Sequence, residues 1–336
     1  MESQKSSSSL PEGVELFSHQ AAGHKHGQGR LGIGVLKHKN GDVLKPMFDG
    51  DRRASIELSF YRNVFETNQP DILIKELRCF LPEFHGIWET NIEGKSVQYI
   101  CLEDVSKNFE NPSVLDVKMG CITYDDDANE DKILSQSTKF KYGEALGIRI
   151  LGMKVYNDDE NNYLPKIEKS FWRKLAPDTF TSGLNHFLTT NKHINMLILS
   201  GFIHKLVKLS DWFSRQRLFK FIGSSLLFVY EGTFLPWSSW SDENHINIDF
   251  SNSTETATHV DYNLCLNKAD ATPDFCDVCC LCRNVCSKLT DCHLYRVVMI
   301  DFSHCFPFHE EDTNYTFGLH KLIEYLRDLL KAQRES

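Results

Sequence analysis

The chain has 336 residues, of which 41% are hydrophobic and 25% charged, and a formal net charge of −9. This length is enough for two packed lobes or one large domain, and the charged share is typical of soluble globular proteins. The negative charge argues against nucleic-acid binding, because nucleic-acid binders usually carry a basic face. It does not exclude an anionic small molecule, which a local basic cluster can bind.

The start of the chain, MESQKSSSSLPEG, is polar and lacks the apolar stretch of a secretory signal, so we expect residues 1–13 to be a disordered tail. No apolar run is long enough to span a bilayer. We therefore expect a protein of the cytoplasm or the nucleus, monomeric and without stable membrane association. Its 11 cysteines are then reduced thiols.

Residues 14–105 predict a small α+β lobe, the N-lobe, with an antiparallel sheet and a helix. Short apolar steps on both sides of Asn40-Gly41 indicate a hairpin, since Asn-Gly favours a tight turn. A further strand is expected at Ser96–Cys101. The helix between them is predicted by apolar residues at i, i+4 and i+8, namely Ile56, Phe60 and Val64.

Two features of this lobe suggest ATP binding. Lys45 ends the second hairpin strand and Glu57 lies on the next helix. A strand lysine held by a helix glutamate positions ATP phosphates in kinase-like folds. In such a fold, Leu102–Val105 would be a hinge whose backbone binds adenine. The alternative is a solvated lysine and a surface carboxylate.

Three glycines before the hairpin, Gly27, Gly29 and Gly32, spell GxGxxG. A dinucleotide-binding fold needs this motif to open into a helix. A hairpin follows instead, which excludes that fold. A flexible loop and a loop that covers phosphates both stay open.

Residues 106–237 predict the first part of a larger C-lobe, mainly helical after an initial strand. Residues 238–292 are polar and Cys-rich with little periodicity, which indicates an insertion or a long loop. Residues 293–336 continue the C-lobe. Its apolar segments are Ala145–Tyr156, Ile194–Phe213 and Leu218–Tyr230, followed by the strand Arg296–Phe302 and the closing helix Phe317–Leu330.

Residues 112–120, PSVLDVKMG, place chemistry for phosphoryl transfer at a strand end. Asp116 and Lys118 are two positions apart and therefore point to the same side. The carboxylate can accept or orient a hydroxyl proton, and the ammonium can neutralise charge on the moving phosphoryl group. Both are candidate catalytic residues. The alternative is an exposed ion pair at a strand edge.

This segment resembles the PxxxDxKxG signature of the inositol polyphosphate kinase family, with Pro112, Asp116, Lys118 and Gly120 in place. Further segments resemble family blocks in the same order: His19–His24, Leu102–Val105, Ser224–Leu227, Ile300–Phe302 and Tyr315–Leu330. The resemblance implies a two-lobed, protein-kinase-like α+β fold, with a small N-lobe and a larger helical C-lobe.

The resemblance also implies where ATP and Mg²⁺ bind. Asp301 would hold Mg²⁺ with help from Ser225, because a hard cation that bridges two phosphates needs oxygen ligands. Lys45 would contact the ATP phosphates. The ATP-binding residues implied are Lys45, Glu57, Glu103, Asp104, Val105 and Asp301.

A predicted helix after the motif presents two basic groups and one amide on one face, because Lys132, Gln136 and Lys139 are spaced at i, i+4 and i+7. These groups suit phosphates around a rigid ring, and the alternative is an ordinary solvated face. By resemblance, Lys166 and His304 join them. The expected substrate ligands are Lys118, Lys132, Gln136, Lys139, Lys166 and His304. Many members of the multikinase branch have two adjacent glutamines where this chain has Ser135 and Gln136, which removes one amide contact.

Two features of the insertion lie outside the predicted active site. Seven cysteines lie from Cys265 to Cys292. Cys276 and Cys279 have the CxxC spacing of half a zinc site, with Cys282 and Cys286 as candidates for a second pair, so a zinc site and a loop of reduced thiols both stay open. The segment His245–Phe250 repeats the letters IDF without an apolar strand before them, and we assign it no metal.

We therefore expect an ATP- and Mg²⁺-dependent kinase that phosphorylates inositol tris- and tetrakisphosphates towards inositol pentakisphosphate, as the multikinase branch does. One alternative is an inositol hexakisphosphate kinase that makes pyrophosphates. Another is a non-catalytic scaffold of the same fold.

Overall fold

The computed structural model describes most of the chain outside one long segment. The described residues are 10–22, 33–48, 50–92, 94–125, 127–190, 193–194, 196–233 and 294–335. They belong to one of two compact units, which comprises residues 1–233 and 294–336. The other unit, with the predicted cysteine cluster and the second IDF, lies outside the described residues, as do the glycines of GxGxxG. The predicted boundaries of tail, lobes and insertion stay predictions.

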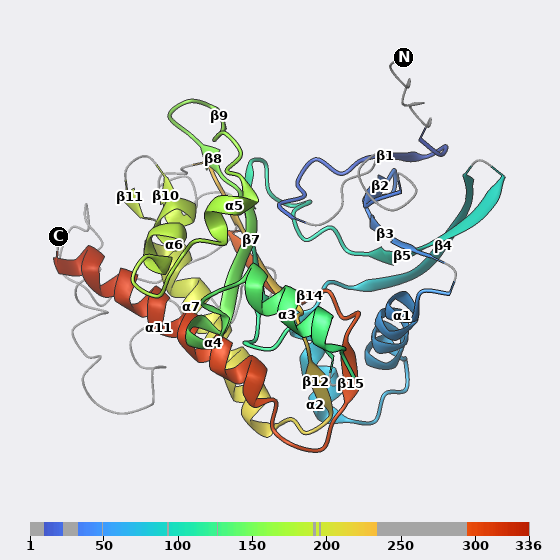
Figure 1. Ribbon diagram of the computed structural model, residues 1–336. Coiled ribbons are helices and arrows are strands. Elements are labelled where there is room, and N and C mark those ends of the chain that lie inside the picture. Colours follow the sequence, from blue (N-terminus) through green and yellow to red (C-terminus); the bar gives the residue numbers. More distant parts are fainter. Residues whose placement is uncertain are drawn as a thin grey trace, which may run out of the picture. The chain divides into compact units, whose positions relative to one another are not determined.

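The N-lobe is built on a five-stranded antiparallel sheet in the order β1-β2-β3-β5-β4 (Figure 1). Its strands are β1 (Val14–Leu16), β2 (Leu36–His38), β3 (Val43–Met47), β4 (Phe84–Ile92) and β5 (Lys95–Leu102). The predicted hairpin is confirmed, since β2 pairs with β3 across the Asn40-Gly41 turn. Gly41 adopts φ +98° there, a conformation that glycine takes without steric cost. The predicted strand at Ser96–Cys101 is β5.

Helix α1 (Arg52–Phe65) confirms the helix predicted from apolar spacing. Asp51 precedes it and accepts a hydrogen bond from the backbone N–H of Arg53. This contact satisfies one of the donors that a first helical turn leaves without an intrahelical partner. Helix α2 (Ile72–Leu77) and the short 3-10 helix η2 (Arg78–Phe80) then lead into β4.

The buried face of α1 anchors this helix to a distant part of the chain. The ring of Phe60 lies 4.2 Å from the ring of Phe302, centroid to centroid, and Phe302 is 0% exposed. Phe302 directly follows Asp301. The aromatic contact therefore fixes α1, and the Glu57 that it carries, next to Asp301.

The C-lobe is built on a four-stranded antiparallel sheet in the order β14-β13-β6-β7. Its strands are β6 (Pro112–Met119), β7 (Ile148–Lys154), β13 (Ser225–Glu231) and β14 (Tyr295–Ile300). Because β13 runs antiparallel to both neighbours, β6 and β14 run in the same direction. Ser225, at the start of β13, lies opposite Lys118 on one side and Ile300 on the other. The C-terminal ends of β6 and β14 therefore meet at one edge of the sheet.

Two segments of the C-lobe differ from the expectation of a mainly helical region. Strand β7 lies within Ala145–Tyr156, and β12 (Phe219–Phe221) and most of β13 lie within Leu218–Tyr230. Short apolar runs of this kind do not distinguish a strand from a buried helix. Strand β13 is buried along nearly its whole length between two neighbours, so its sequence lacks the alternation of a half-exposed strand.

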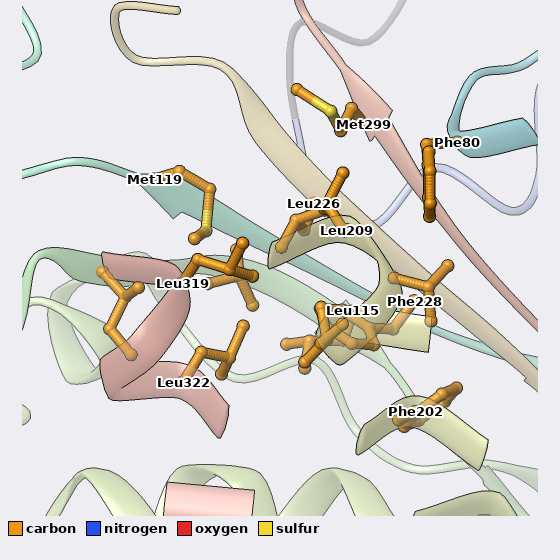
Figure 2. Packing of buried hydrophobic residues seen from close by; sticks show 14 of the residues in the cluster. Phe80, Leu115, Met119, Phe202, Leu209, Leu226, Phe228, Met299, Leu319 and Leu322 are labelled. Atoms are coloured by element: carbon orange, nitrogen blue, oxygen red, sulfur yellow. The ribbon is translucent and has the colours of Figure 1, made fainter. Parts of the chain in front are cut away.

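Helices α7 (Met196–Arg215) and α11 (Thr313–Glu335) share the main core with this sheet. Figure 2 shows Leu115 and Phe228 of the strands beside Leu319 and Leu322 of α11. The predicted closing helix is thus confirmed and is longer at both ends. The shorter elements are α3 (Glu130–Lys139), α4 (Gly143–Leu146), α5 (Lys169–Trp172), α6 (Phe180–Leu188), β8 (Tyr156–Asn157), β9 (Asn162–Tyr163), β10 (Thr189–Thr190), β11 (His193–Ile194) and β15 (Cys305–Pro307). Among the described helices, none combines the length and apolar character that a membrane span requires.

The contact between Phe60 and Phe302 predicts a large loss of stability when the second ring is removed. Phe302→Ala should lower the free energy of unfolding by about 3–5 kcal/mol, because the truncation leaves a cavity between α1 and β14. Urea denaturation measures this change. Ile72→Ala is the control, since Ile72 is 65% exposed, and should stay within about 0.5 kcal/mol of the starting protein. Equal effects of the two substitutions would contradict the docking of α1 on Phe302.

Candidate active site

Lys45 joins the N-lobe sheet to the strand ends of the C-lobe. Its Nζ lies 2.8 Å from Glu57 Oε1 and 2.5 Å from Asp301 Oδ1. Burial by itself would lower the pKa of Lys45, but Asp301 and Glu57 outweigh it and raise this pKa, so the ammonium stays charged. Glu57 is 2% exposed and also accepts hydrogen bonds from the Phe302 N–H and the Ser303 hydroxyl, at 3.2 and 3.1 Å. The expected contact of Lys45 with Glu57 is present, and its role towards ATP stays a prediction.

Asp301 is held in an unusual backbone conformation. Its φ of +65° lies in the left-handed region, which non-glycine residues rarely occupy and which occurs preferentially at functional sites. Burial by itself would raise the pKa of Asp301, but Lys45 and then Lys118 outweigh it and lower this pKa. The carboxylate is therefore ionised. Its side chain remains 45% exposed, so a ligand can reach it.

Asp116 lies on β6 in a very different environment, with only 5% of the residue exposed. Burial, and next the charge of Asp301, raise the pKa of Asp116 from 3.8 to about 7. Ser225, Lys118 and Lys45 oppose this rise. Burial also lowers the pKa of the neighbouring Lys118. A carboxyl group with a pKa near 7 can take up and release a proton near neutral pH, as a general base must.

Several buried oxygens at this edge fit a hard divalent cation. Asp116 Oδ1, Ser224 Oγ and Ser225 Oγ are buried and have no well-formed hydrogen bond to any described residue. Together with the exposed carboxylate of Asp301 they offer oxygen ligands, which Mg²⁺ prefers. No group of three or more His, Cys, Asp or Glu side chains able to hold a metal is present in the described part of the chain. In proteins, Mg²⁺ is commonly held by one or two carboxylates plus substrate phosphates.

The predicted hinge is held by contacts that the sequence did not reveal. Glu103 forms a two-pronged ion pair with Arg296 of β14, at 2.9 and 3.1 Å, and its backbone N–H donates to the Glu83 carbonyl at 2.9 Å. Of the polar groups of Glu103, only the backbone carbonyl is therefore left for adenine. Asp104 is 1% exposed and its carboxylate binds Ser106 and Lys37, so its side chain supports the hinge.

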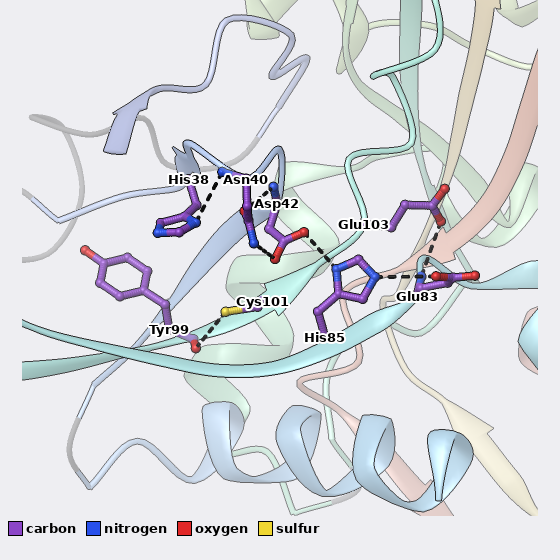
Figure 3. A network of polar contacts seen from close by, with 8 residues as sticks. All are labelled: His38, Asn40, Asp42, Glu83, His85, Tyr99, Cys101 and Glu103. Atoms are coloured by element: carbon purple, nitrogen blue, oxygen red, sulfur yellow. Dashed lines mark hydrogen bonds and ion pairs between the residues drawn. The ribbon is translucent and has the colours of Figure 1, made fainter. Parts of the chain in front are cut away.

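A polar network extends from the hinge to the N-lobe hairpin (Figure 3). His85 Nδ1 lies 2.8 Å from Asp42 Oδ1, and His85 Nε2 lies 3.4 Å from Glu83 Oε2. Glu103 Oε2 accepts the backbone N–H of Glu83 at 3.3 Å. The hairpin turn, the start of β4 and the hinge are thereby connected. Asp42, His85 and Glu103 are far apart in sequence, and no spacing rule relates them.

Two of the six predicted substrate ligands contact the same carboxylate. Lys132 Nζ lies 3.5 Å from Asp125 Oδ2, and His304 Nδ1 lies 2.6 Å from Asp125 Oδ1, so one carboxylate brings these two candidates together. Gln136 and Lys139 follow on the same helix α3, half-buried and exposed respectively. Lys166 is exposed in the loop between β9 and α5, and Lys118 lies on β6. The binding roles of all six stay predictions.

Arg149 is a basic residue of this region that the sequence analysis missed. It lies on β7 directly opposite Lys118, and its Nε is buried without a hydrogen-bond partner among the described residues. Burial, and next the charge of Arg173, lower the pKa of Arg149. Had Ala145–Tyr156 been interpreted as a strand, the register beside β6 would have pointed to this residue.

Gly120, the last residue of the signature, has a structural reason to be glycine. Its φ is +92°, and a Cβ there would lie 2.4 Å from Asn314 Nδ2 of α11. Asn314 in turn accepts the Ile122 N–H at 2.8 Å and donates to the Ile122 carbonyl at 2.9 Å. The close approach of α11 thus directs the chain away from β6 towards Asp125.

Comparison with known proteins assigns this site to a family. Residues 99–327 match the family model described as inositol polyphosphate kinase. The chain belongs to this family. The inositol polyphosphate multikinase of Rattus norvegicus is 29% identical over 374 aligned positions, which cover 95% of this chain and 93% of the relative. The Homo sapiens protein of the same name is 35% identical over 224 positions, covering 67% of this chain and 53% of the human protein. That alignment spans about half of the human protein.

A solved structure is similar along most of its length. It is described as inositol phosphate multikinase from S. cerevisiae in complex with ADP and Mn²⁺, and it superposes with a TM-score of 0.57. Sequence identity is 22%, with 86% of this chain and 99% of that chain covered. The expected two-lobed α+β fold of the inositol polyphosphate kinases is thereby confirmed.

The raised pKa of Asp116 predicts a pH-dependent cost of burying its carboxylate. Between its ordinary value of 3.8 and its folded value of about 7, the folded protein binds the proton better than the unfolded chain. Stability from this group is therefore lost as the pH rises through that window. The Asp116→Asn side chain does not titrate. The free energy of unfolding of this variant minus that of the starting protein should therefore increase as the pH rises through the window, by about 4 kcal/mol at most. Urea denaturation at pH 4 to 8 measures this difference, and a constant difference would contradict the raised pKa.

Proposed function

We propose that this protein is an ATP- and Mg²⁺-dependent kinase that phosphorylates ring hydroxyls of inositol tris- and tetrakisphosphates towards the pentakisphosphate. The observation that carries this proposal is the contact of Lys45 with both Glu57 and Asp301, beside a buried Asp116. It joins an ammonium, a strained exposed carboxylate and a titratable carboxyl at one sheet edge. Family membership and the relatives named multikinase support the substrate class.

The N-lobe and the hinge would bind ATP. Lys45 would neutralise charge on its phosphates, and the backbone of Glu103, Asp104 and Val105 would bind adenine. Because the side chains of Glu103 and Asp104 are tied to Arg296 and Lys37, this backbone is held in place before a nucleotide arrives. Such preorganisation lowers the entropic cost of binding.

Asp301 and Ser225 would hold Mg²⁺ at the end of β14. The ion, when bound, supplies positive charge between phosphates. Asp301 is suited to this role because its carboxylate is ionised and exposed. A cation there would also offset the repulsion between Asp301 and Asp116, which is part of the reason that the pKa of Asp116 is raised.

Asp116 and Lys118 would serve the transfer step. With a pKa of about 7, Asp116 can accept the proton of a ring hydroxyl. Lys118 lies two residues along the same strand and would neutralise charge on the phosphoryl group as it moves. The protein therefore acts by position and charge, without a covalent intermediate on the chain.

The substrate would lie against the basic groups beyond β6. Lys132, Gln136 and Lys139 of α3, together with Lys166 and His304, would meet its phosphates. Arg149 adds a half-buried guanidinium beside Lys118. We further propose that the protein works as a monomer in the cytoplasm or the nucleus, without stable membrane association.

Incubation with ATP, Mg²⁺ and a panel of inositol tris- to hexakisphosphates tests the function. We expect conversion of tris- and tetrakisphosphates to the pentakisphosphate, resolved by anion-exchange chromatography. Asp301→Asn should lower turnover at least about 100-fold, because an amide cannot replace the charge at the metal. Asparagine tolerates a positive φ, so this variant should fold.

The other outcomes of this assay are equally informative. Turnover of the hexakisphosphate alone would replace the proposal with a pyrophosphate-forming kinase. No turnover of any substrate by folded protein that binds ATP would indicate a scaffold.

A single lysine on α3 tests the substrate face. Lys139→Met should raise the KM for inositol trisphosphate about tenfold, the usual size of a lost charged contact, and leave the KM for ATP unchanged. Lys331→Met, the same charge change on the exposed part of α11, is the matched control and should alter neither constant. Equal KM values for both variants would remove Lys139 from the substrate site.

A further inference from the structure

Asp125 is an acidic residue within the basic substrate region, and the proposed function gives it no role. It lies in the loop between β6 and α3, with 18% of its side chain exposed. Its two carboxylate oxygens face different partners: Oδ1 lies 2.6 Å from His304 Nδ1, and Oδ2 lies 3.5 Å from Lys132 Nζ. Oδ1 and His304 Nδ1 are both buried, and neither makes a well-formed hydrogen bond to any described residue, so their 2.6 Å approach is a close polar contact between two atoms that are otherwise unsatisfied there.

The local fold does not need this carboxylate. Helix α3 is capped by Asn129, whose side-chain oxygen accepts the Lys132 N–H at 2.9 Å. Asp125 contributes to the turn through its backbone carbonyl, which accepts the Ala128 N–H at 3.0 Å. An asparagine at position 125 would keep that backbone contact. The side chain of Asp125 therefore acts on His304 and Lys132 rather than on the helix.

The contact decides which nitrogen of His304 is left for a ligand. A carboxylate oxygen only accepts hydrogen bonds, so the proton of the imidazole belongs on Nδ1 and Nε2 is left for a ligand. Nε2 donates to a phosphate only when the ring carries both protons, and a neighbouring carboxylate favours that charged form. The groups that act on the ring are Asp125, Lys132 and Lys118; burial and the two lysines lower the pKa of His304, and Asp125 opposes them.

We infer that Asp125 is a positioning residue that aims His304 and Lys132 at one phosphate of the inositol ring. The inference rests on the proposed function, since it assigns a phosphate to this corner of the site. Asp125 itself touches no phosphate. Its carboxylate restrains a lysine with several rotatable bonds and orients an imidazole, so both side chains are in place before the substrate arrives. The negative charge of the phosphate would then favour the doubly protonated ring, whose Nε2 can donate.

The kinetics of Asp125→Asn test this role. We expect the KM for inositol trisphosphate to rise about tenfold, with kcat changed less than about threefold and the KM for ATP unchanged. Asp127→Asn is the matched control, because Asp127 is two residues away, loses the same charge and is 73% exposed. Its constants should equal those of the starting protein. Thermal unfolding of both variants should show that the fold is kept.

A double-mutant cycle separates positioning from general electrostatics. In a His304→Gln background, Asp125→Asn should add less than about threefold to the KM, because most of its effect passes through His304. A full tenfold effect in that background would overturn the inference. So would a lower KM in Asp125→Asn, which would mean that the carboxylate mainly repels the substrate.

Different results would contradict the proposed kinase function and the role of Asp125. A starting protein that converts no inositol phosphate would contradict the proposed function. An active starting protein whose Asp125→Asn variant has an unchanged KM would contradict only the role of Asp125.

Discussion

The contact of Lys45 with Glu57 and Asp301 is the constraint on which the rest of the site depends. It connects three elements that are distant in sequence: strand β3, helix α1 and the end of β14. Glu57 is held in addition by the Phe302 backbone N–H and the Ser303 hydroxyl, and its helix α1 packs against the ring of Phe302. Removing one charge of such a partly buried group would leave the others uncompensated. The two lobes are therefore joined at the position where ATP phosphates would lie.

The neighbouring carboxylates Asp116 and Asp301 show how environment separates two chemically identical groups. Asp301 is exposed and faces two ammonium groups, so its pKa is lowered. Asp116 is buried beside that negative charge, so its pKa rises to about 7. One is suited to hold a cation and the other to move a proton. The parallel direction of β6 and β14 on either side of β13 brings them together.

Much of the fold and part of the site could be predicted from the sequence. The hairpin at Asn40-Gly41, helix α1 and the closing helix followed from turn chemistry and helical spacing, which are local signals. Strands β7 and β13 were missed, because a short apolar run does not distinguish a strand from a buried helix, and β13 is buried along nearly its whole length. Arg149 was missed with β7, since its place beside Lys118 is a matter of register.

The sequence by itself determined the family, through the spacing of Asp116, Lys118 and Gly120 and the order of the other motifs. Only the tertiary structure decided which charges meet. The pairs Glu103 with Arg296 and Asp125 with His304 are separated by more than 170 residues of chain, and no local pattern relates them. A motif is a pattern of residues that are close together in the sequence. Which charged side chains pair depends instead on strand order and helix docking. Both are determined by the long-range packing of the core.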